Sequence, residues 1–276
     1  MSDDFPLADL ALSRRLERAE GLSNARFVES RARVRPASGA CWIAVAGAYA
    51  MFDGPTSPAT QTFGLGMSQL PTGEDLDRIE AFFVERGAPV CHEVSPLADD
   101  KLVPMLTARG YRPIEFTSVM YQPIDLARLG ARQSRPAVVT VRQVGTDDLG
   151  VFARTSAAGW SHSGLGDFLL EMAQVNAASD GVSLFLAELD GQPIATAALS
   201  VVDEVAHLAG ASTIPEGRNR GAQLALLDHR LRFAAAHGCT IALMGALPGS
   251  GSQRNAERNG FRIAYTRIKW GQKIEI

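Results

Sequence analysis

Residues 212–223 decide the fold, and they read Ser212–Thr213–Ile214–Pro215–Glu216–Gly217–Arg218–Asn219–Arg220–Gly221–Ala222–Gln223. The apolar run before this stretch is typical of a strand, and the run after it is typical of an amphipathic helix. A helix N-terminus carries unpaired backbone N–H groups and a partial positive charge, so it can hold an anion. Arg218 and Arg220 add positive charge, and Gly221 allows close approach to the backbone. The stretch predicts a turn that holds a diphosphate; the alternative is a solvated basic loop.

The elements around this turn alternate between helix and strand. The helix after the turn is predicted to bury Leu224, Leu227, Leu231 and Ala234 and to end at His237–Gly238. Asp190–Gly191 predicts a tight turn between two strands. The predicted strands lie at 138–144, 182–189, 193–202, 205–214, 240–246 and 261–270, and the predicted helices at 146–160, 166–178 and 250–258.

The first half of the chain repeats this order of elements. Ala108–Arg109–Gly110–Tyr111–Arg112 echoes the later run Arg258–Asn259–Gly260–Phe261–Arg262. We therefore expect two copies of one fold, over residues 1–126 and 138–276, with a polar linker at 127–137. In the first copy we expect a helix over 7–34 with a break at Gly21, strands at 40–52, 60–67, 90–94 and 114–121, and helices at 72–86 and 99–109.

Composition excludes several classes of protein. The 276 residues are 46% hydrophobic and 21% charged, with a formal net charge of −3, as in an ordinary globular protein. This balance predicts no nucleic-acid or membrane partner. Cys41, Cys91 and Cys239 are odd in number and widely spaced, which favours reduced thiols and a cytoplasmic location. Cys91–His92 does not predict a metal site, because adjacent strand residues point to opposite faces.

The second half of the chain resembles the GNAT superfamily of acyl-CoA-dependent N-acyltransferases. The family signature, Arg/Gln-x-x-Gly-x-Gly/Ala after Pro-Glu, matches residues 218–223 after Pro215–Glu216. A second match is the helix with Ser252–Asn255, followed by Glu257–Phe261 and a final strand. The resemblance covers residues 138–276 well, and it reaches the first half through element order. It implies a mixed α/β fold of two GNAT-like domains, each a mostly antiparallel mixed sheet flanked by helices.

The resemblance also implies a coenzyme, acetyl-CoA, with coenzyme A as the bound product and no metal. Its diphosphate would be held at the turn by Arg218, Asn219, Arg220, Gly221, Ala222 and Gln223. Ser212, Thr213 and Ile214 would offer main-chain groups to the pantetheine arm, which adds beside their strand. Main-chain N–H groups there would stabilise the oxyanion. Ser252 and Asn255 are either coenzyme contacts or helix caps.

The catalytic residues are less clearly marked. Gln223 replaces the final Gly/Ala of the signature, Gly249 replaces an Asn, and Ala256 occupies the position of the Tyr that often protonates the leaving thiolate. Tyr265 and Ser252 are the remaining candidates for that acid. His207 lies on the strand before the turn, and histidine is the residue type whose ordinary pKa suits a base near neutral pH, so it is the candidate base. The alternative for His207 is a structural strand histidine.

The acceptor site is predicted between two helices, with Trp160 and His162 as lining residues; an ordinary helix end is the alternative. In the first copy, Ser68–Asp75 replaces the phosphate turn. It has no arginine, and Glu74 and Asp75 occupy the place of an anion. We therefore expect the first copy to bind no coenzyme and to help wall the acceptor cleft.

The resulting prediction is a monomer whose tandem domains mimic a dimer. The second copy is predicted to transfer an acetyl group from acetyl-CoA to a primary amine of a small-molecule acceptor, by direct attack in a ternary complex. One alternative is a non-catalytic acyl-CoA sensor, and another is a structural or partner-binding module.

Overall fold

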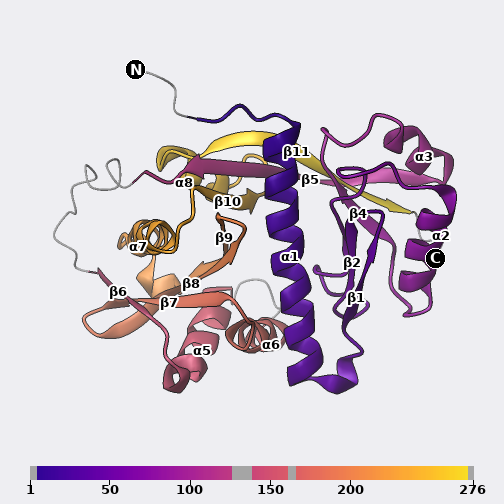
Figure 1. Ribbon diagram of the computed structural model, residues 1–276. Helices are drawn as coiled ribbons and strands as arrows, with labels where there is room; N and C mark the ends of the chain where they lie inside the picture. Colours follow the sequence, from indigo (N-terminus) through magenta and orange to yellow (C-terminus); the bar gives the residue numbers. More distant parts are fainter. Residues whose placement is uncertain (1–4, 126–138, 161–165, 273–276) are drawn as a thin grey trace. The chain divides into compact units, whose positions relative to one another are not determined.

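A computed structural model describes residues 5–125, 139–160 and 166–272, drawn in Figure 1. The chain forms two compact units. Unit 1 comprises Met1–Gln122 and Gly245–Ile276, and unit 2 comprises Pro123–Met244. The predicted linker at 127–137 lies outside the described residues.

Unit 1 is a mixed sheet covered by helices on both faces. Its strand order is β1-β2-β3-β4-β11-β5, and neighbours are antiparallel except for the parallel pair β3–β4. The long helix α1 packs on β1, β2 and β3. The elements are α1 Leu10–Val34, η1 Pro36–Ser38, β1 Cys41–Val45, β2 Ala48–Phe52, β3 Gln61–Phe63, α2 Gly73–Val84, β4 Cys91–Val94, α3 Leu102–Ala108, β5 Tyr111–Pro123, α8 Gly251–Arg258 and β11 Arg262–Gln272.

Two expectations for the start of the chain were wrong. The helix is not broken at Gly21, because α1 continues through it to Val34. A Cβ at Gly21 would lie 2.8 Å from the Tyr49 ring, so this glycine permits close packing rather than ending a helix. The single strand expected over 40–52 is a hairpin instead, because Ala46 and Gly47 both adopt positive φ and reverse the chain.

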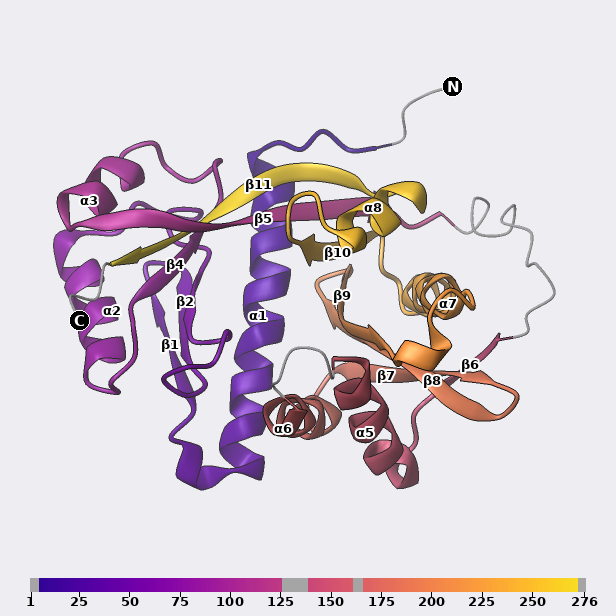
Figure 2. The same cartoon turned by 180° about the vertical axis from the view of Figure 1, so that it is seen from behind.

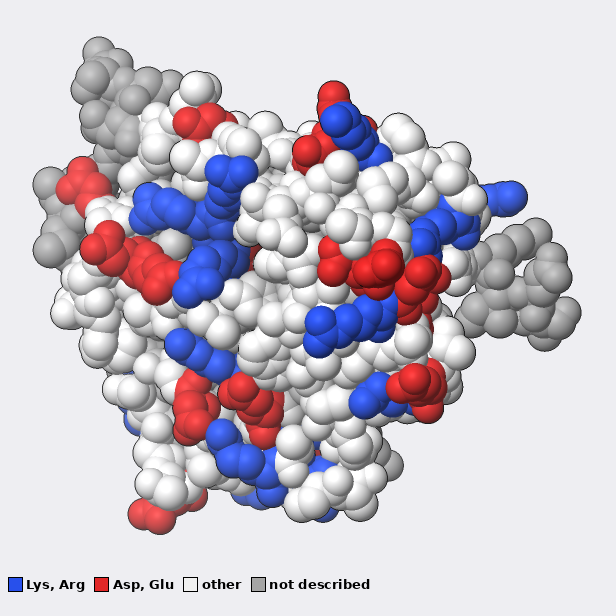
Figure 3. Space-filling view, turned by 45° about the vertical axis from the view of Figure 1, so that its right-hand side comes forward, with Lys and Arg blue, Asp and Glu red and all other residues white. Residues whose placement is uncertain are grey.

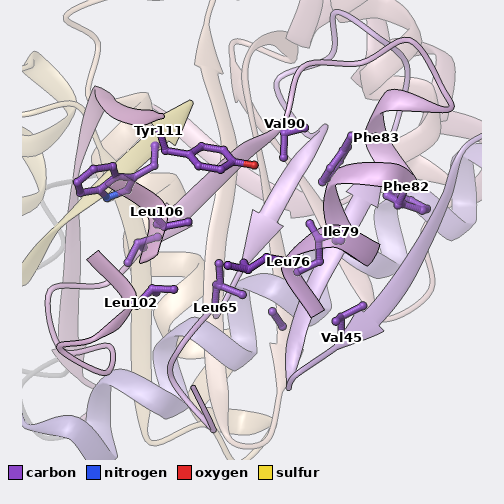
Figure 4. Close-up of a cluster of buried hydrophobic side chains, with 14 of the residues drawn as sticks. Val45, Leu65, Leu76, Ile79, Phe82, Phe83, Val90, Leu102, Leu106 and Tyr111 are labelled. Carbon is purple, nitrogen blue, oxygen red and sulfur yellow. The ribbon is translucent and has the colours of Figure 1, made fainter. Parts of the chain in front are cut away.

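The core of unit 1 confirms the predicted pattern of α2. Leu76, Ile79, Phe82 and Phe83 are buried on one side of this helix. They pack with Tyr111 and other side chains of the sheet and of α3, as Figure 4 shows. A second cluster, including Val28, Met51 and Phe63, lies between α1 and the strands it covers.

Unit 1 also buries a group of charges, which we call the Arg267 cluster: Glu17, Glu20, Glu93, Tyr265 and Arg267. The Arg267 guanidinium lies 2.9 Å from Glu93 Oε2 and 2.9 Å from each carboxylate oxygen of Glu20. Burial raises the pKa of Glu17. The cluster joins α1, β4 and β11, so it ties the last strand of the chain to its first helix.

The strands of unit 2 follow the order β10-β9-β8-β7-β6. Only the pair β9–β10 is parallel among these described strands. Figure 2 shows α5 and α6 on one face and α7 on the other. The elements are β6 Val139–Gln143, η2 Thr146–Asp148, α5 Leu149–Gly159, α6 Gly166–Ala177, β7 Val182–Leu189, β8 Gln192–Val202, β9 Val205–Thr213, η4 Pro215–Gly217, α7 Ala222–Ala236 and β10 Ile241–Ala246.

Alternation along β7 places side chains on both faces of the unit 2 sheet. Leu184 and Leu186 pack with Phe152 of α5, while the Phe185 ring meets Phe233 of α7 at 5.3 Å between centroids. The predicted turn at Asp190–Gly191 is confirmed by positive φ at both residues. In α7, Leu227, Leu231 and Ala234 are buried as expected, but Leu224 is 49% exposed and Leu226 is buried instead.

The compact units divide the chain differently from the predicted domains. Residues 245–276 were expected to complete the second domain, yet they group with unit 1. The reason is strand pairing, because β11 lies between β4 and β5 and pairs with β5 from Arg262–Tyr121 to Gln272–Tyr111. Where the two copies are divided in the sequence stays a prediction.

On the face shown in Figure 3, Lys and Arg side chains are interspersed with Asp and Glu. This is the distribution expected for a formal net charge of −3. No helix of the described residues is long and apolar enough to cross a membrane.

Candidate functional site: the turn between β9 and α7

The stretch predicted to hold a diphosphate forms an exposed turn between β9 and α7. The chain leaves β9 through the 3₁₀ turn Pro215–Gly217 and then passes through two left-handed residues, Asn219 with φ 61° and Gly221 with φ 83°. A Cβ at Gly217 would lie 2.7 Å from Ile194 Cβ, so only glycine fits there. Arg218, Asn219 and Arg220 are exposed.

The first turn of α7 is open to an anion. Gly221 is the N-cap, and within the described part of the chain no side chain caps this helix end. The backbone hydrogen bonds within α7 begin with Ala225 N–H to Gly221 O at 3.0 Å. The N–H groups of the preceding residues therefore point out of the helix end. With two arginines alongside, the geometry fits a diphosphate.

The corresponding turn in unit 1 is closed by its own residues. Thr72 and Asp75 form a capping box at the start of α2, with Asp75 N–H to Thr72 Oγ1 at 3.1 Å and Thr72 N–H to Asp75 Oδ2 at 2.9 Å. The hydrogen bonds that the Asp75 carboxylate accepts from the Thr72 N–H and hydroxyl lower the pKa of Asp75. The anion position is therefore filled by a carboxylate of the protein.

Side chains of helix α1 form hydrogen bonds to the loops near that closed turn. Arg14 Nε donates to the Met67 carbonyl at 2.7 Å, and Ser13 Oγ lies 3.0 Å from Ser95 Oγ. Met67 follows β3 and Ser95 follows β4, so these contacts lie where the parallel pair of unit 1 ends.

In unit 2 the corresponding parallel strands pair over a short length. The register of β9 with β10 ends at His207 and Leu243, although β9 continues to Thr213. On its other side β9 remains paired with β8 as far as Thr213 with Ala195. The outer half of β9 therefore presents a backbone edge, of the kind to which an extended ligand adds.

Gln223 ties the end of β9 to α7, a role the sequence did not indicate. Its Nε2 donates to the Ser212 carbonyl at 3.2 Å and to Thr213 Oγ1 at 2.8 Å. The residue that departs from the family signature thus supplies two hydrogen bonds. A polar side chain one position after the helix start was the available signal.

The predicted pantetheine contacts are partly engaged within unit 2. Ser212 Oγ lies 2.9 Å from Thr196 Oγ1 and 3.2 Å from the Ser156 carbonyl. Ile214 N–H donates to Ile194 O at 2.9 Å, and Ile214 O accepts from Gly217 N–H at 3.0 Å. Ile214 therefore already uses its main-chain donor, and a contact with pantetheine would rely on its second carbonyl lone pair.

His207 lies at the inner end of this edge and is 7% exposed. It pairs in register with Ser200 of β8, on the face of the sheet that α5 and α6 cover. Ala209 and Gly210, which follow it, are exposed. His207 and Ser212 therefore flank an exposed segment of small residues, which leaves room for reacting groups. The role of His207 as a base stays a prediction.

Tyr265 belongs to the Arg267 cluster of unit 1. Its hydroxyl donates to Glu17 Oε1 at 2.8 Å, and burial raises the pKa of the phenol well above its ordinary value. A phenol whose proton is already donated to a carboxylate is a poor acid, so this geometry favours a structural role. Ala256 is 1% exposed.

The remaining predicted residues lie on surfaces. Ser252 and Asn255 are exposed on α8 in unit 1. Ser250, not Ser252, caps this helix by accepting Gln253 N–H at 3.1 Å. Trp160 follows α5 and is 48% exposed, and His162 lies outside the described residues. The described residues contain no cluster of three His, Cys, Asp or Glu side chains that could hold a metal ion.

Comparison with known proteins identifies the fold. Residues 152–261 match the sequence model of the acetyltransferase (GNAT) family. No curated protein matches the chain. A GCN5-related N-acetyltransferase from Kribbella flavida superposes with a TM-score of 0.61 at 18% identity, covering 92% of this chain and 96% of that one.

Two further structures have the same fold. A tandem GNAT protein from the clavulanic acid biosynthesis pathway gives a TM-score of 0.60 at 10% identity and covers 96% of both chains. A GCN5-related N-acetyltransferase from Sphaerobacter thermophilus gives 0.51 at 16% identity and covers 97% of this chain and 93% of that one. The expected fold class is confirmed.

The open anion site, the short parallel pair and the family match together define a class of protein. Residues 152–261 match the acetyltransferase (GNAT) family, and the chain has the fold of GNAT proteins.

Proposed function

We propose that unit 2 transfers an acetyl group from acetyl-CoA to a primary amine of a small molecule, by direct attack in a ternary complex. The observation that carries this proposal is the contrast between the two helix starts. The start of α7 is uncapped and flanked by Arg218 and Arg220, whereas the start of α2 is closed by Thr72 and Asp75. Only the former suits a coenzyme diphosphate, so the first copy has no coenzyme site in this proposal.

Coenzyme binding uses the turn and the outer half of β9. The N–H groups from Asn219 to Gln223 and the side chains of Arg218 and Arg220 hold the diphosphate, since the Arg218 N–H already donates to Pro215 O at 3.3 Å. The main chain of Ser212 and Thr213 meets the pantetheine arm. Ser252 and Asn255 of α8 are proposed as further contacts. No metal takes part.

The reaction forms a C–N bond between the amine and the acyl carbon and breaks the C–S bond. Acetyl-CoA supplies the activated acyl group as a thioester. His207 takes the proton that the amine must lose, directly or through a water molecule. Main-chain N–H groups at the edge of β9 stabilise the oxyanion. Trp160 and His162 line the acceptor pocket, and the protein works as a monomer in the cytoplasm.

The proton that the leaving thiolate needs has no dedicated donor in this proposal. The hydroxyl of Tyr265 is engaged by Glu17, and Ala256 offers no acid. Solvent at the exposed edge of β9 therefore protonates the thiolate. This feature also supports the second candidate, an acyl-CoA sensor that binds without transfer.

The test measures thiol release from acetyl-CoA across a panel of small amines, with mass spectrometry of the acetylated product. Turnover on at least one amine supports transfer, and saturable binding without turnover on any amine supports the sensor. Absence of binding refutes both. Coenzyme A at a hundredfold excess over its Kd should stabilise the fold by about 2.7 kcal/mol.

His207→Ala tests the base. We expect lower turnover and loss of the limb of the pH–rate profile that reports its deprotonation, with an unchanged Kd for acetyl-CoA. An unchanged pH profile would assign His207 a structural role.

A further inference from the structure

Arg230 is a buried cation on the sheet-facing side of α7. It is 2% exposed, and burial lowers the pKa of its guanidinium to about 10. Its Nη1 donates to the Ala198 carbonyl of β8 at 3.1 Å, and its Nε donates to the Leu226 carbonyl at 3.3 Å. Among the described residues it has no carboxylate partner. Burying a guanidinium without a counterion costs free energy. The carbonyls that accept its hydrogen bonds therefore indicate what Arg230 does.

The carbonyl that Arg230 binds lies beside a β-bulge. Ala198 pairs with Ala209, and Thr196 pairs with Ser212, so Gly210 and Ala211 together oppose the single residue Ala197. Gly210 has φ +59°, as a bulge of this kind requires. A bulge interrupts the ladder of strand hydrogen bonds, and Arg230 supplies a donor at that interruption.

The bulge sets which face the end of β9 presents. Side chains alternate along a strand, so one inserted residue reverses the face of every residue after it. Because of the insertion, Ser212 faces α5, where it meets the Ser156 carbonyl, and Thr213 faces α7, where Gln223 reaches it. Without it, both side chains would change faces and the hydrogen bonds to Gln223 and Ser156 would be lost.

We propose that Arg230 is a positioning residue for the acyl-transfer site: it holds the bulge of β9 and thereby the orientation of the strand end that leads into the coenzyme turn. This inference rests on the proposed function. Arg230 does not contact substrate itself, because it is buried beneath β8.

The experiment compares Arg230→Met with Arg232→Met. Both remove an arginine from α7, but Arg232 is exposed and pairs with Asp228 on its own helix at 2.8 Å. Methionine keeps the apolar stem of Arg230, and removing a buried charge that has no counterion also removes the free-energy cost of its desolvation. The readouts are amide hydrogen exchange by mass spectrometry, the melting temperature and acetyl-CoA binding by calorimetry.

In Arg230→Met we expect exchange over residues 208–213 to accelerate by about 10- to 100-fold, the range for a lost hydrogen bond to a charged group. We expect weaker acetyl-CoA binding and a melting temperature that does not fall. Arg232→Met should match the wild type in all three readouts. If Arg230→Met folds poorly, Arg230→Lys, which keeps a long stem and a donor, should show a smaller acceleration at the same residues.

Unchanged exchange over 208–213, or an equal acceleration across the whole of unit 2, would overturn the positioning role. The exchange readout needs no substrate, so it decides on Arg230 even where no amine is acetylated. Failure of the wild type to bind acetyl-CoA would instead refute the proposed function.

Discussion

The fully buried His92 predicts that acid weakens unit 1. His92 lies on β4 with an exposure of 0%, and burial lowers the pKa of its imidazole to about 3 from 6.5. Its ring packs against Tyr111 at 4.8 Å between centroids. Neither ring nitrogen has a hydrogen-bond partner among the described residues. The same holds for Thr62 Oγ1 and Trp270 Nε1 on the register partners in β3 and β11, and burial alone accounts for the lowered pKa of His92.

The sign of this pH effect follows from which state of the chain, folded or unfolded, binds the proton more readily. Below pH 6.5 the unfolded chain protonates His92, whereas the folded chain keeps it neutral until about pH 3. Above pH 6.5, His92 therefore does not reduce the free energy of unfolding. Below pH 6.5, that free energy falls by about 1.4 kcal/mol per pH unit. At pH 5 this amounts to about 2 kcal/mol in the free energy of unfolding, a factor of about 30 in the folded-to-unfolded ratio.

The assay is urea unfolding of the whole chain at pH 8 and pH 5 in a Trp160→Phe background. The remaining tryptophans, Trp42 and Trp270, both lie in unit 1, so fluorescence reports that unit. His92→Leu removes the titrating group at similar volume, and His237→Leu is the matched control, because it removes an exposed imidazole of unit 2.

We expect the stability difference between His92→Leu and the wild type to shift by about 2 kcal/mol in favour of the variant between pH 8 and pH 5. The raised pKa of Glu17 acts in the opposite direction, but it is common to both proteins and cancels. A difference that is the same at both pH values would refute the reasoning, since the folded chain would then protonate His92 as readily as the unfolded chain.

Three further predictions concern the site and the Arg267 cluster. Replacing Arg218 and Arg220 together by Ala should weaken acetyl-CoA binding by about 10- to 100-fold per lost charge-assisted contact, measured by calorimetry; unchanged affinity would remove the turn from the proposal. Gln223→Leu should cost about 1–3 kcal/mol in coenzyme affinity, because it frees the end of β9; equal affinity would make its two hydrogen bonds incidental. Tyr265→Phe should destabilise unit 1 by about 1–3 kcal/mol in urea unfolding and leave turnover intact; a selective loss of turnover would restore Tyr265 as the acid.

Local features were predictable because their causes lie within a few residues. The period of Leu76, Ile79, Phe82 and Phe83 and the cap at Thr72 defined α2 correctly. The turn at Asp190–Gly191 was equally predictable from the sequence, since both residue types tolerate positive φ. The turn at Ala46–Gly47 was missed, because alanine rarely adopts that conformation and the run around it is uniformly apolar.

The candidate site was predictable in its chemistry and less so in its connections. The basic glycine turn and the strand before it follow from residues 205–223 alone, and the folded chain brings them together with His207. The clamp by Gln223, the bulge at Gly210 and the donor from Arg230 depend on how strands and helix meet. No local sequence pattern predicts these three features, because each depends on which strands and helices pack together.

By itself, the sequence determined the helix start with its arginines, the carboxylate-capped counterpart at Thr72–Asp75 and the two-copy order of elements. Each of these depends on backbone conformation and charge within one or two turns of chain. Only the tertiary structure decided that Tyr265 binds Glu17, 248 positions away, and that β11 lies between β4 and β5. Strand pairing and burial join residues regardless of their separation along the chain, so the last strand belongs with the first helix although nothing near either of them in the sequence marks the other.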